Sequence, residues 1–95
     1  MAYQLKFLPK ALKEWHALDS SLRKQFGAKL KERLEHPHIP ASRLSGFNNV
    51  YKIKLRAAGY RLVYQVNEKE IWVLVIAVVK RDKDLVYKKL KDRLE

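Results

Sequence analysis

The first half of the chain carries one short segment of alternating polarity and two segments with helical periodicity. Residues 3–7 alternate apolar and polar side chains, which predicts a β-strand with one face on a core. Residues 8–18 place apolar side chains three and four positions apart, and Pro9 suits the first position of a helix. Asp19 can cap a second amphipathic helix, which ends before Pro37. The short link between the helices predicts an antiparallel helix hairpin.

The second half predicts three strands and a final helix. After a loop rich in Pro, Ser, Gly and Asn, residues 51–56 and 60–65 alternate apolar and polar side chains around a short turn, which predicts a β-hairpin. Residues 71–79 are apolar at every position and rich in β-branched side chains, as in a central strand covered on both faces. Asp82 and Asp84 can cap a helix that runs to the end of the chain.

The order β-α-α-β-β-β-α predicts an α+β fold. We expect a small antiparallel sheet of about four strands, with the N-terminal helix hairpin on one face and the C-terminal helix at the other side or edge. The 95 residues are too few for two cores, so residues 1–95 are expected to form a single domain. Trp15, Phe26 and Trp72 are assigned to the core.

Composition narrows the functional classes. The 21 Lys and Arg residues against 10 Asp and Glu give a net charge of +11, which favours a polyanionic partner. The sequence has no Cys, so disulfides, thiolate catalysis and Cys-bound metals are excluded. The longest apolar stretch is far shorter than the ~20 residues of a membrane-spanning helix. We therefore expect a soluble, cytoplasmic protein with no membrane partner.

The charges are unevenly distributed along the chain. Glu14, Glu32 and Glu35 interleave with cations on the outer sides of the first two helices, whereas the 32 residues after Glu35 contain no carboxylate until Glu68.

Within this acid-free window, the predicted hairpin pairs Leu55 with Tyr60 and Lys54 with Arg61. Like charges directly opposite each other destabilise a sheet by roughly 0.2–1 kcal/mol. A phosphate backbone would turn this repulsion into shared attraction. The alternative is that these residues form only the solvated face of a half-buried hairpin.

Other catalytic chemistry has little support in the sequence. His36 and His38 flank Pro37 with no further ligand nearby, which is more typical of a loop than of a metal site. His16 lies among polar helix positions. The acid-free window offers no paired carboxylates, and no glycine-rich phosphate-binding motif is present. We expect neither a metal nor a cofactor.

Several motifs together resemble a known family. They are YKIKLR at 51–56, GYRLVY at 59–64, Lys80-Arg81 with Tyr87, and ALKEW at 11–15. This set is similar to the RelE toxins of the RelE/ParE type II toxin–antitoxin superfamily, and the similarity runs through essentially the whole chain. It implies a ribosome-dependent endoribonuclease that cuts mRNA in the A site of the 70S ribosome and inhibits translation. It also implies a RelB-like antitoxin, which binds operator DNA together with the toxin and represses the operon.

The resemblance assigns roles to five residues. Lys54 would be the general base, deprotonated because neighbouring cations disfavour its charged form. Lys52 and Arg61 would bind the scissile phosphate. Arg81 would stabilise or protonate the leaving group, and Tyr87 would stack on a base or orient the attacking hydroxyl.

Four further residues are assigned to RNA binding: Arg43, Ser45, Arg56 and Lys80. The family often has a basic residue just before the glycine at Gly46, where this chain has Ser45. Arg43 is the candidate substitute for that loop contact.

Two other functions remain open from the sequence. The sister toxins of the ParE type share this fold and poison DNA gyrase without nuclease chemistry. A basic domain that binds RNA or the ribosome without catalysis would also account for the charge.

Overall fold

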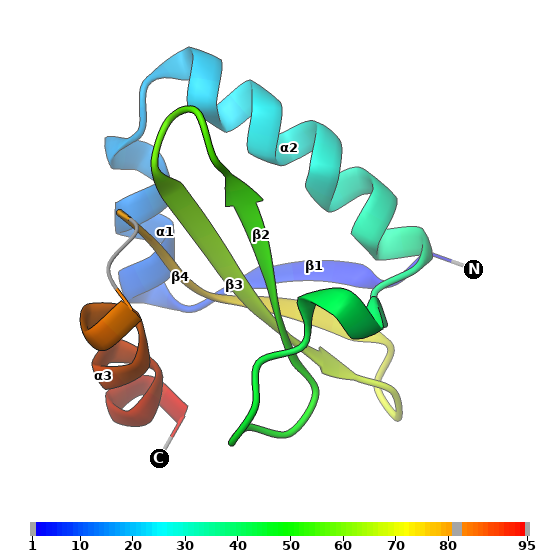
Figure 1. The fold of residues 1–95 in the computed structure, drawn as a ribbon. Coiled ribbons are helices and arrows are strands. Elements are labelled where there is room, and N and C mark those ends of the chain that lie inside the picture. The colour runs from blue at the N-terminus through cyan, green and yellow to red at the C-terminus, as the bar shows by residue number, and fades with distance from the viewer. Residues whose placement is uncertain (1, 81–82, 95) are drawn as a thin grey trace.

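Four strands and three helices follow one another in the predicted order in the part of the chain that the structure describes (Figure 1). The structure is a computed structural model that describes residues 2–80 and 83–94. The elements are β1 (Gln4–Phe7), α1 (Pro9–Ala17), α2 (Ser20–Glu35), β2 (Val50–Leu55), β3 (Tyr60–Asn67), β4 (Trp72–Lys80) and α3 (Lys83–Leu94), with one 3₁₀ turn at Pro40–Ser42.

The sheet is mixed, which corrects the prediction of an antiparallel sheet. The strand order is β1-β4-β3-β2, and β1 runs parallel to β4 with Leu5 beside Val73. The pairs β2–β3 and β3–β4 are antiparallel. Alternation of polarity shows which side chains share a face, but it carries no information on the direction of a neighbour that lies far away in the sequence.

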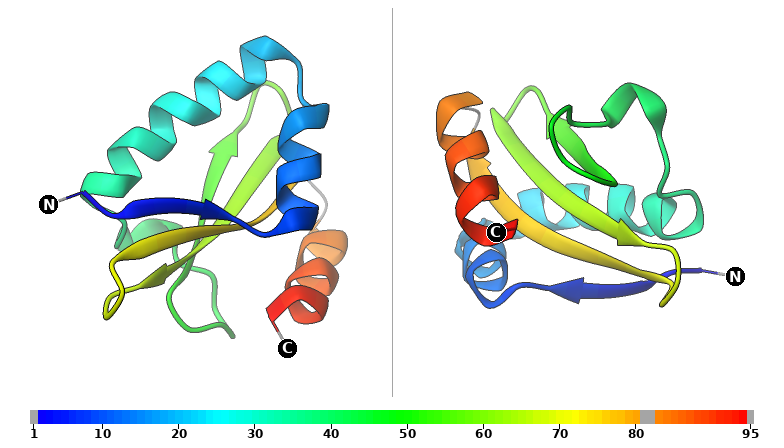
Figure 2. Two further views of the ribbon diagram at one scale, coloured as in Figure 1. Left: turned by 180° about the vertical axis from the view of Figure 1, so that it is seen from behind. Right: turned by 90° about the horizontal axis from the view of Figure 1, so that it is seen from below.

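Helices cover the two faces of the sheet unequally. The hairpin of α1 and α2 covers one face, and α3 lies on the other face beside the segment that follows α2 (Figure 2). Two apolar clusters fill these interfaces, one on each side. The central strand β4 supplies both of them, as its unbroken apolar run predicts: Val73, Val75 and Val78 face the helix hairpin, and Ile76, Ala77 and Val79 face α3.

Local signals for the first two helices are confirmed. Pro9 begins α1, and the side chain of Asp19 accepts a hydrogen bond of 2.9 Å from the backbone N–H of Leu22 at the start of α2. None of the described helices is long and apolar enough to cross a bilayer.

A charged network fastens α3 to the rest of the fold. Glu14 of α1 accepts hydrogen bonds from both guanidinium nitrogens of Arg93 (2.8 and 3.0 Å), from Lys89 (2.8 Å) and from the backbone N–H of Val78 (3.1 Å). Arg93 also donates to the carbonyl oxygen of Ile76. Burial raises the pKa of Glu14, but these donors outweigh burial and lower it to about 2. Glu14 is therefore a half-buried anchor between helices, which corrects its assignment to the outer side of the helix.

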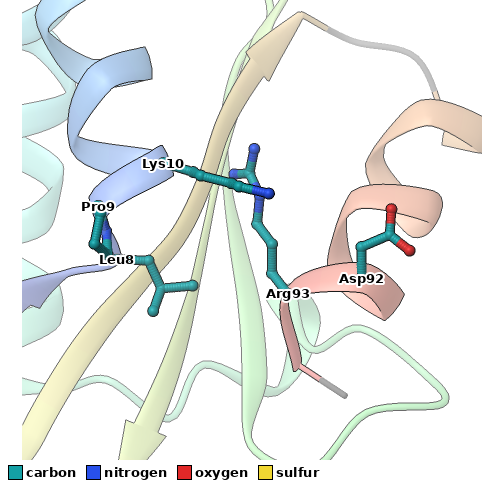
Figure 3. A pocket seen from close by; sticks show the side chains of 5 residues that line it. All are labelled: Leu8, Pro9, Lys10, Asp92 and Arg93. Atoms are coloured by element: carbon teal, nitrogen blue, oxygen red, sulfur yellow. The ribbon is translucent and has the colours of Figure 1, made fainter.

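A small open pocket remains beside this network, between the start of α1 and the end of α3. Lys10 from α1 and Arg93 from α3 extend into the space between the two helices, and Leu8, Pro9 and Asp92 complete the lining (Figure 3).

Candidate active site

The cations of the β2–β3 hairpin lie on the face of the sheet that carries α3. The predicted register is confirmed, with Leu55 opposite Tyr60 and Lys54 opposite Arg61. Side chains of laterally paired residues share a face, and the apolar members of these rows belong to the cluster beneath α3. The rows are Lys54, Arg61 and Val79, then Lys52, Val63 and Ala77, then Val50, Gln65 and Leu74.

Arg61 is the most unusual charge in this group. Its side chain is only 4% exposed, although Arg is rarely buried without a partner. Its Nε is buried with no hydrogen-bond partner, and among the described residues Arg61 forms no salt bridge. A buried unsatisfied donor costs about 1–3 kcal/mol, and the nearest residue across the strand pair is another cation, Lys54. The arrangement is therefore one that an anionic ligand would stabilise.

Two aromatic side chains stand on the same side of the sheet. Tyr87 of α3 stacks on Phe47 of the loop before β2, with ring centroids 6.0 Å apart and an angle of 20° between the planes. Phe47 packs against the apolar cluster that also contains Val63. The sequence motifs include Tyr87 as a candidate site residue but do not include Phe47. An aromatic residue among Ser, Gly and Asn in a loop was the signal that could have drawn attention to it.

The four predicted RNA-binding residues are not gathered with these cations. Arg56 is exposed in the turn of the hairpin, and Ser45 is exposed in the loop that carries Phe47. Lys80 pairs with Tyr60, which packs on the helix-hairpin side of the sheet. Arg43 forms an isolated antiparallel bridge with Tyr51, whose side chain is also on the helix-hairpin side. Because bridge partners point to one face, Arg43 lies on the side of the sheet away from the hairpin cations, and its substitution for a basic residue at Ser45 stays a prediction.

One predicted catalytic residue, Arg81, lies outside the described residues. The other four are described, and the strand pairs bring Lys52, Lys54 and Arg61 together on one face.

The contacts of His38 and Trp72 are typical of residues that support the fold. His38 bridges the hydroxyl of Tyr51 and the carboxylate of Glu68 through its two ring nitrogens, each at 2.8 Å. Among residues 2–80 and 83–94, no three His, Asp or Glu side chains gather as a metal site would require. Trp72 was predicted to be a core residue but is half-buried. Its Nε1 donates to the exposed carboxylate of Glu70, and the ammonium group of Lys6 lies over its ring, so both contacts are made at the surface.

Beneath the site, the buried Tyr64 ties β3 to the end of α2. Its hydroxyl donates to the carbonyl oxygen of Pro37 (2.7 Å) and accepts from Arg33 (2.8 Å). Burial raises the pKa of Tyr64, although Arg33 opposes the rise. Arg33 also donates to the backbone carbonyl of Lys52, so this network supports the strand that carries two of the cations.

Comparisons with known proteins decide the family. Residues 5–85 match the family model described as the ParE toxin of the type II toxin–antitoxin system parDE. The chain is 50% identical to the mRNA interferase toxin RelE of Escherichia coli K12, over 99% of both chains. A putative RelE-like toxin protein of Escherichia coli is 48% identical, again over 99% of both chains. This chain belongs to the RelE group of the RelE/ParE toxin superfamily.

Solved RelE structures share the fold. A free E. coli RelE variant in which two arginines are replaced by alanine superposes with a TM-score of 0.91 at 48% identity, over the full length of both chains. The toxin chain of the intact E. coli RelBE toxin–antitoxin complex gives 0.83 at 52% identity, covering 85% of this chain and 99% of that one. The resemblance inferred from the motifs and the predicted α+β architecture are both confirmed.

The Lys, Arg and Tyr side chains of this RelE-family site can interact with RNA in three ways. Lys and Arg can bind a phosphodiester and stabilise the extra negative charge that forms when it is attacked. A neutral Lys amine can accept a proton from a ribose hydroxyl. A tyrosine ring can stack on a base. These capacities suit cleavage of RNA at its own 2′-hydroxyl.

Proposed function

We propose that this protein is the toxin of a type II toxin–antitoxin pair and acts as an mRNA interferase. It cleaves mRNA in the A site of the translating ribosome and so inhibits translation. The proposal is supported by the RelE relatives, which are about half identical along the whole chain and include proteins named mRNA interferase.

The observation that carries this proposal is the buried Arg61 beside Lys54. An unsatisfied Nε and an opposing cation are unfavourable in the free protein. Both become favourable when a phosphate lies between them, and more so as the phosphate gains charge on the way to a pentavalent transition state. The arrangement of these cations is thus more favourable around the transition state than in a site without ligand.

Each site residue has a distinct proposed part in the reaction. Lys54, as the neutral amine, takes the proton of the 2′-hydroxyl, whose oxygen then attacks the adjacent phosphorus. Lys52 and Arg61 hold the phosphate and stabilise its added negative charge. The bond from phosphorus to the 5′-oxygen breaks, which leaves a 2′,3′-cyclic phosphate. Arg81 stabilises the departing oxygen, which takes a proton from water to become a 5′-hydroxyl, and Tyr87 stacks on a base; Lys54 later returns its proton to solvent. No step needs a metal or a cofactor.

The proposed partners follow from the same assignment. Structures of E. coli RelE with RelB are toxin–antitoxin complexes, so we propose a RelB-like antitoxin for this chain. The ribosomal A site, with its rRNA and mRNA, is the site of action. Operator DNA is bound only as the toxin–antitoxin complex. These partners place the protein in the cytoplasm.

Primer extension on a translated mRNA tests the proposal. Purified protein is added to an mRNA with and without ribosomes, and the cleavage positions are mapped. Wild type should cut within the A-site codon only when ribosomes are present, and Lys54→Met should lose at least about 100-fold in rate. Lys29→Met, on the exposed side of α2, is the matched control and should cleave normally. Equal cutting of naked RNA would contradict ribosome dependence, and binding without cleavage would favour a non-catalytic module.

A gyrase poison of the ParE type is the second candidate, because the matching family model carries the ParE name. The RelE relatives favour the nuclease. Measuring DNA supercoiling and mRNA cleavage in the same extract separates the two, since a gyrase poison would relax DNA and leave mRNA intact.

A further inference from the structure

We propose that Phe47 and Tyr87 together form a stacking platform for one nucleobase of the mRNA beside the cleaved phosphodiester. The inference rests on the proposed nuclease function and adds to it an aromatic support for Tyr87, supplied by a loop outside the cationic hairpin.

The exposure of the pair distinguishes it from the aromatic pairs of the core. The planes of Phe47 and Tyr87 are only 20° apart in a stacked arrangement, so Phe47 backs one face of the Tyr87 ring and leaves its other face to a base. Both side chains are partly exposed. By contrast, Tyr51 and Tyr64, which stack at the same angle of 20° with centroids 5.6 Å apart, are both buried in the core. Single-stranded RNA is commonly bound by stacking its bases on exposed aromatic rings.

Backbone hydrogen bonds fix the conformation of the loop that carries Phe47. The backbone N–H of Leu44 bonds to the carbonyl of Val50, and that of Val66 bonds to the carbonyl of Asn49, each at 2.9 Å. Positive φ angles at Gly46 (87°) and Asn49 (56°) let the chain turn tightly between these bonds. The ring of Phe47 is therefore held towards α3 by backbone bonds that do not involve Tyr87.

The platform lies next to the cations. Phe47 packs on the apolar cluster that includes Val63, and Val63 is the next residue on the same face of β3 after Arg61. Val63 is also paired with Lys52. Residues two apart on a strand are separated by about 6.6 Å. A nucleotide whose phosphate is held by Arg61 and Lys52 can therefore extend its base over the aromatic pair.

The base stacks on the outer surface of the pair and does not insert between the rings. Insertion would need planes about 7 Å apart, twice the ~3.4 Å spacing of stacked bases, whereas the centroids of Phe47 and Tyr87 are only 6.0 Å apart. Phe47 thus backs one face of Tyr87 and holds the ring in its stacking orientation, while the base stacks on the opposite face.

A fluorescent base in the A-site codon tests the platform directly. The mRNA carries 2-aminopurine in that codon and a 2′-deoxy sugar at the cleavage position, so that ribosome-bound complexes form but cannot react. Binding of wild type should quench the 2-aminopurine through stacking. Phe47→Leu, which keeps an apolar side chain but removes the ring, should lose most of the quenching. On cleavable mRNA it should lower kcat/KM by roughly 5- to 100-fold, the range expected for one base–aromatic stack.

Two further variants separate stacking from packing. Phe47→Trp restores a ring and should recover most of the cleavage that Phe47→Leu loses. Phe7→Leu removes a ring from the Phe7–Trp15 pair on the opposite face and serves as the matched control. It should lower the melting temperature without changing quenching or kcat/KM.

The outcomes are distinguishable. Wild-type cleavage with unchanged quenching in Phe47→Leu would overturn the platform, as would a loss of activity that Phe47→Trp fails to reverse. If wild type quenches the base but never cleaves the reactive mRNA, the platform stands and the proposed nuclease function fails.

Discussion

At the scale of single residues, Arg61 occupies a position that is unfavourable for the stability of the free protein and that its proposed function would explain. Its guanidinium is buried, its Nε lacks a partner, and Lys54 lies directly opposite on β2. Core physics alone would favour an apolar side chain of similar length at this position, because buried charges that lack counter-charges are costly. The proposed phosphate contact explains why the cation is there.

Replacing Arg61 should therefore separate stability from activity. We expect Arg61→Met to raise the free energy of unfolding by about 1 kcal/mol, since it removes an unsatisfied donor and a like-charge pair while preserving volume. The same variant should reduce ribosome-dependent cleavage by at least about 100-fold. Urea unfolding and primer extension measure the two effects. A variant that is both less stable and inactive would show that Arg61 holds the hairpin together.

A second residue-scale prediction concerns Tyr64, whose hydroxyl bonds both Arg33 and the carbonyl of Pro37. Tyr64→Phe removes the donor to the buried carbonyl of Pro37 and one acceptor of the partly buried Arg33, and should cost about 1–3 kcal/mol. Because the folded pKa is raised, the ionised phenolate is disfavoured in the fold. Wild-type stability should thus fall as pH rises above about 10, and the variant should lack this component. Denaturant titrations of both proteins at pH 7 and in the alkaline range would reveal it.

At the scale of elements, the position of α3 depends on one carboxylate. Glu14 joins α1, the backbone of β4 and two cations of α3, and α3 carries Tyr87. Within residues 2–80 and 83–94, Glu14 bonds to neither Lys52 nor Arg61, and its link to the site runs through this helix. It is a positioning residue in the proposed reaction.

Glu14→Gln should loosen α3 and lower stability at neutral pH by roughly 3 kcal/mol, given the folded pKa of about 2 against an ordinary 4.5. Because the folded pKa is lowered, this stabilisation is complete above about pH 4.5 and is lost as the pH falls towards 2. The difference in unfolding free energy between wild type and variant should shrink over the same range. A difference independent of pH would show that ionisation of Glu14 is not its cause.

The cleavage assay gives a second measurement on the same variant. Glu14→Gln should lower kcat more than it raises KM, because Lys52 and Arg61 still bind the phosphate while Tyr87 is poorly placed. Glu32→Gln, on an exposed part of α2, is the matched control.

How far the sequence predicts these features depends on how local they are. The hairpin register needed only the alternation around a short turn, and it placed Lys54 opposite Arg61 correctly. The parallel pairing of β1 with β4 and the link from Glu14 to Arg93 join segments more than 60 residues apart. Periodicity within one helix or strand contains no information on such contacts, so Glu14 was assigned to a solvent-facing side.

The same limit applies to the site itself. Residue types and motifs selected the cations and Tyr87 as candidates, but no local pattern in the sequence shows that Arg61 is buried. The stack of Phe47 on Tyr87 depends on the course of a loop whose tight turns use positive φ angles. Both features arise from tertiary packing.

At the scale of the whole molecule, the net charge of +11 is spread along the chain and not confined to the site. Long-range attraction depends on total charge and is screened by salt, whereas a buried contact such as that of Arg61 is screened much less. The proposed encounter with the ribosome and the proposed chemical step should therefore respond differently to ionic strength. Raising salt from about 50 to 200 mM should lower kcat/KM by at least tenfold and leave kcat nearly unchanged. Lys29→Met, which removes one surface charge, should flatten the salt dependence slightly and keep the wild-type kcat. A kcat that fell in parallel with kcat/KM would instead place the salt-sensitive contacts in the transition state, and the surface charge would then belong to the catalytic machinery.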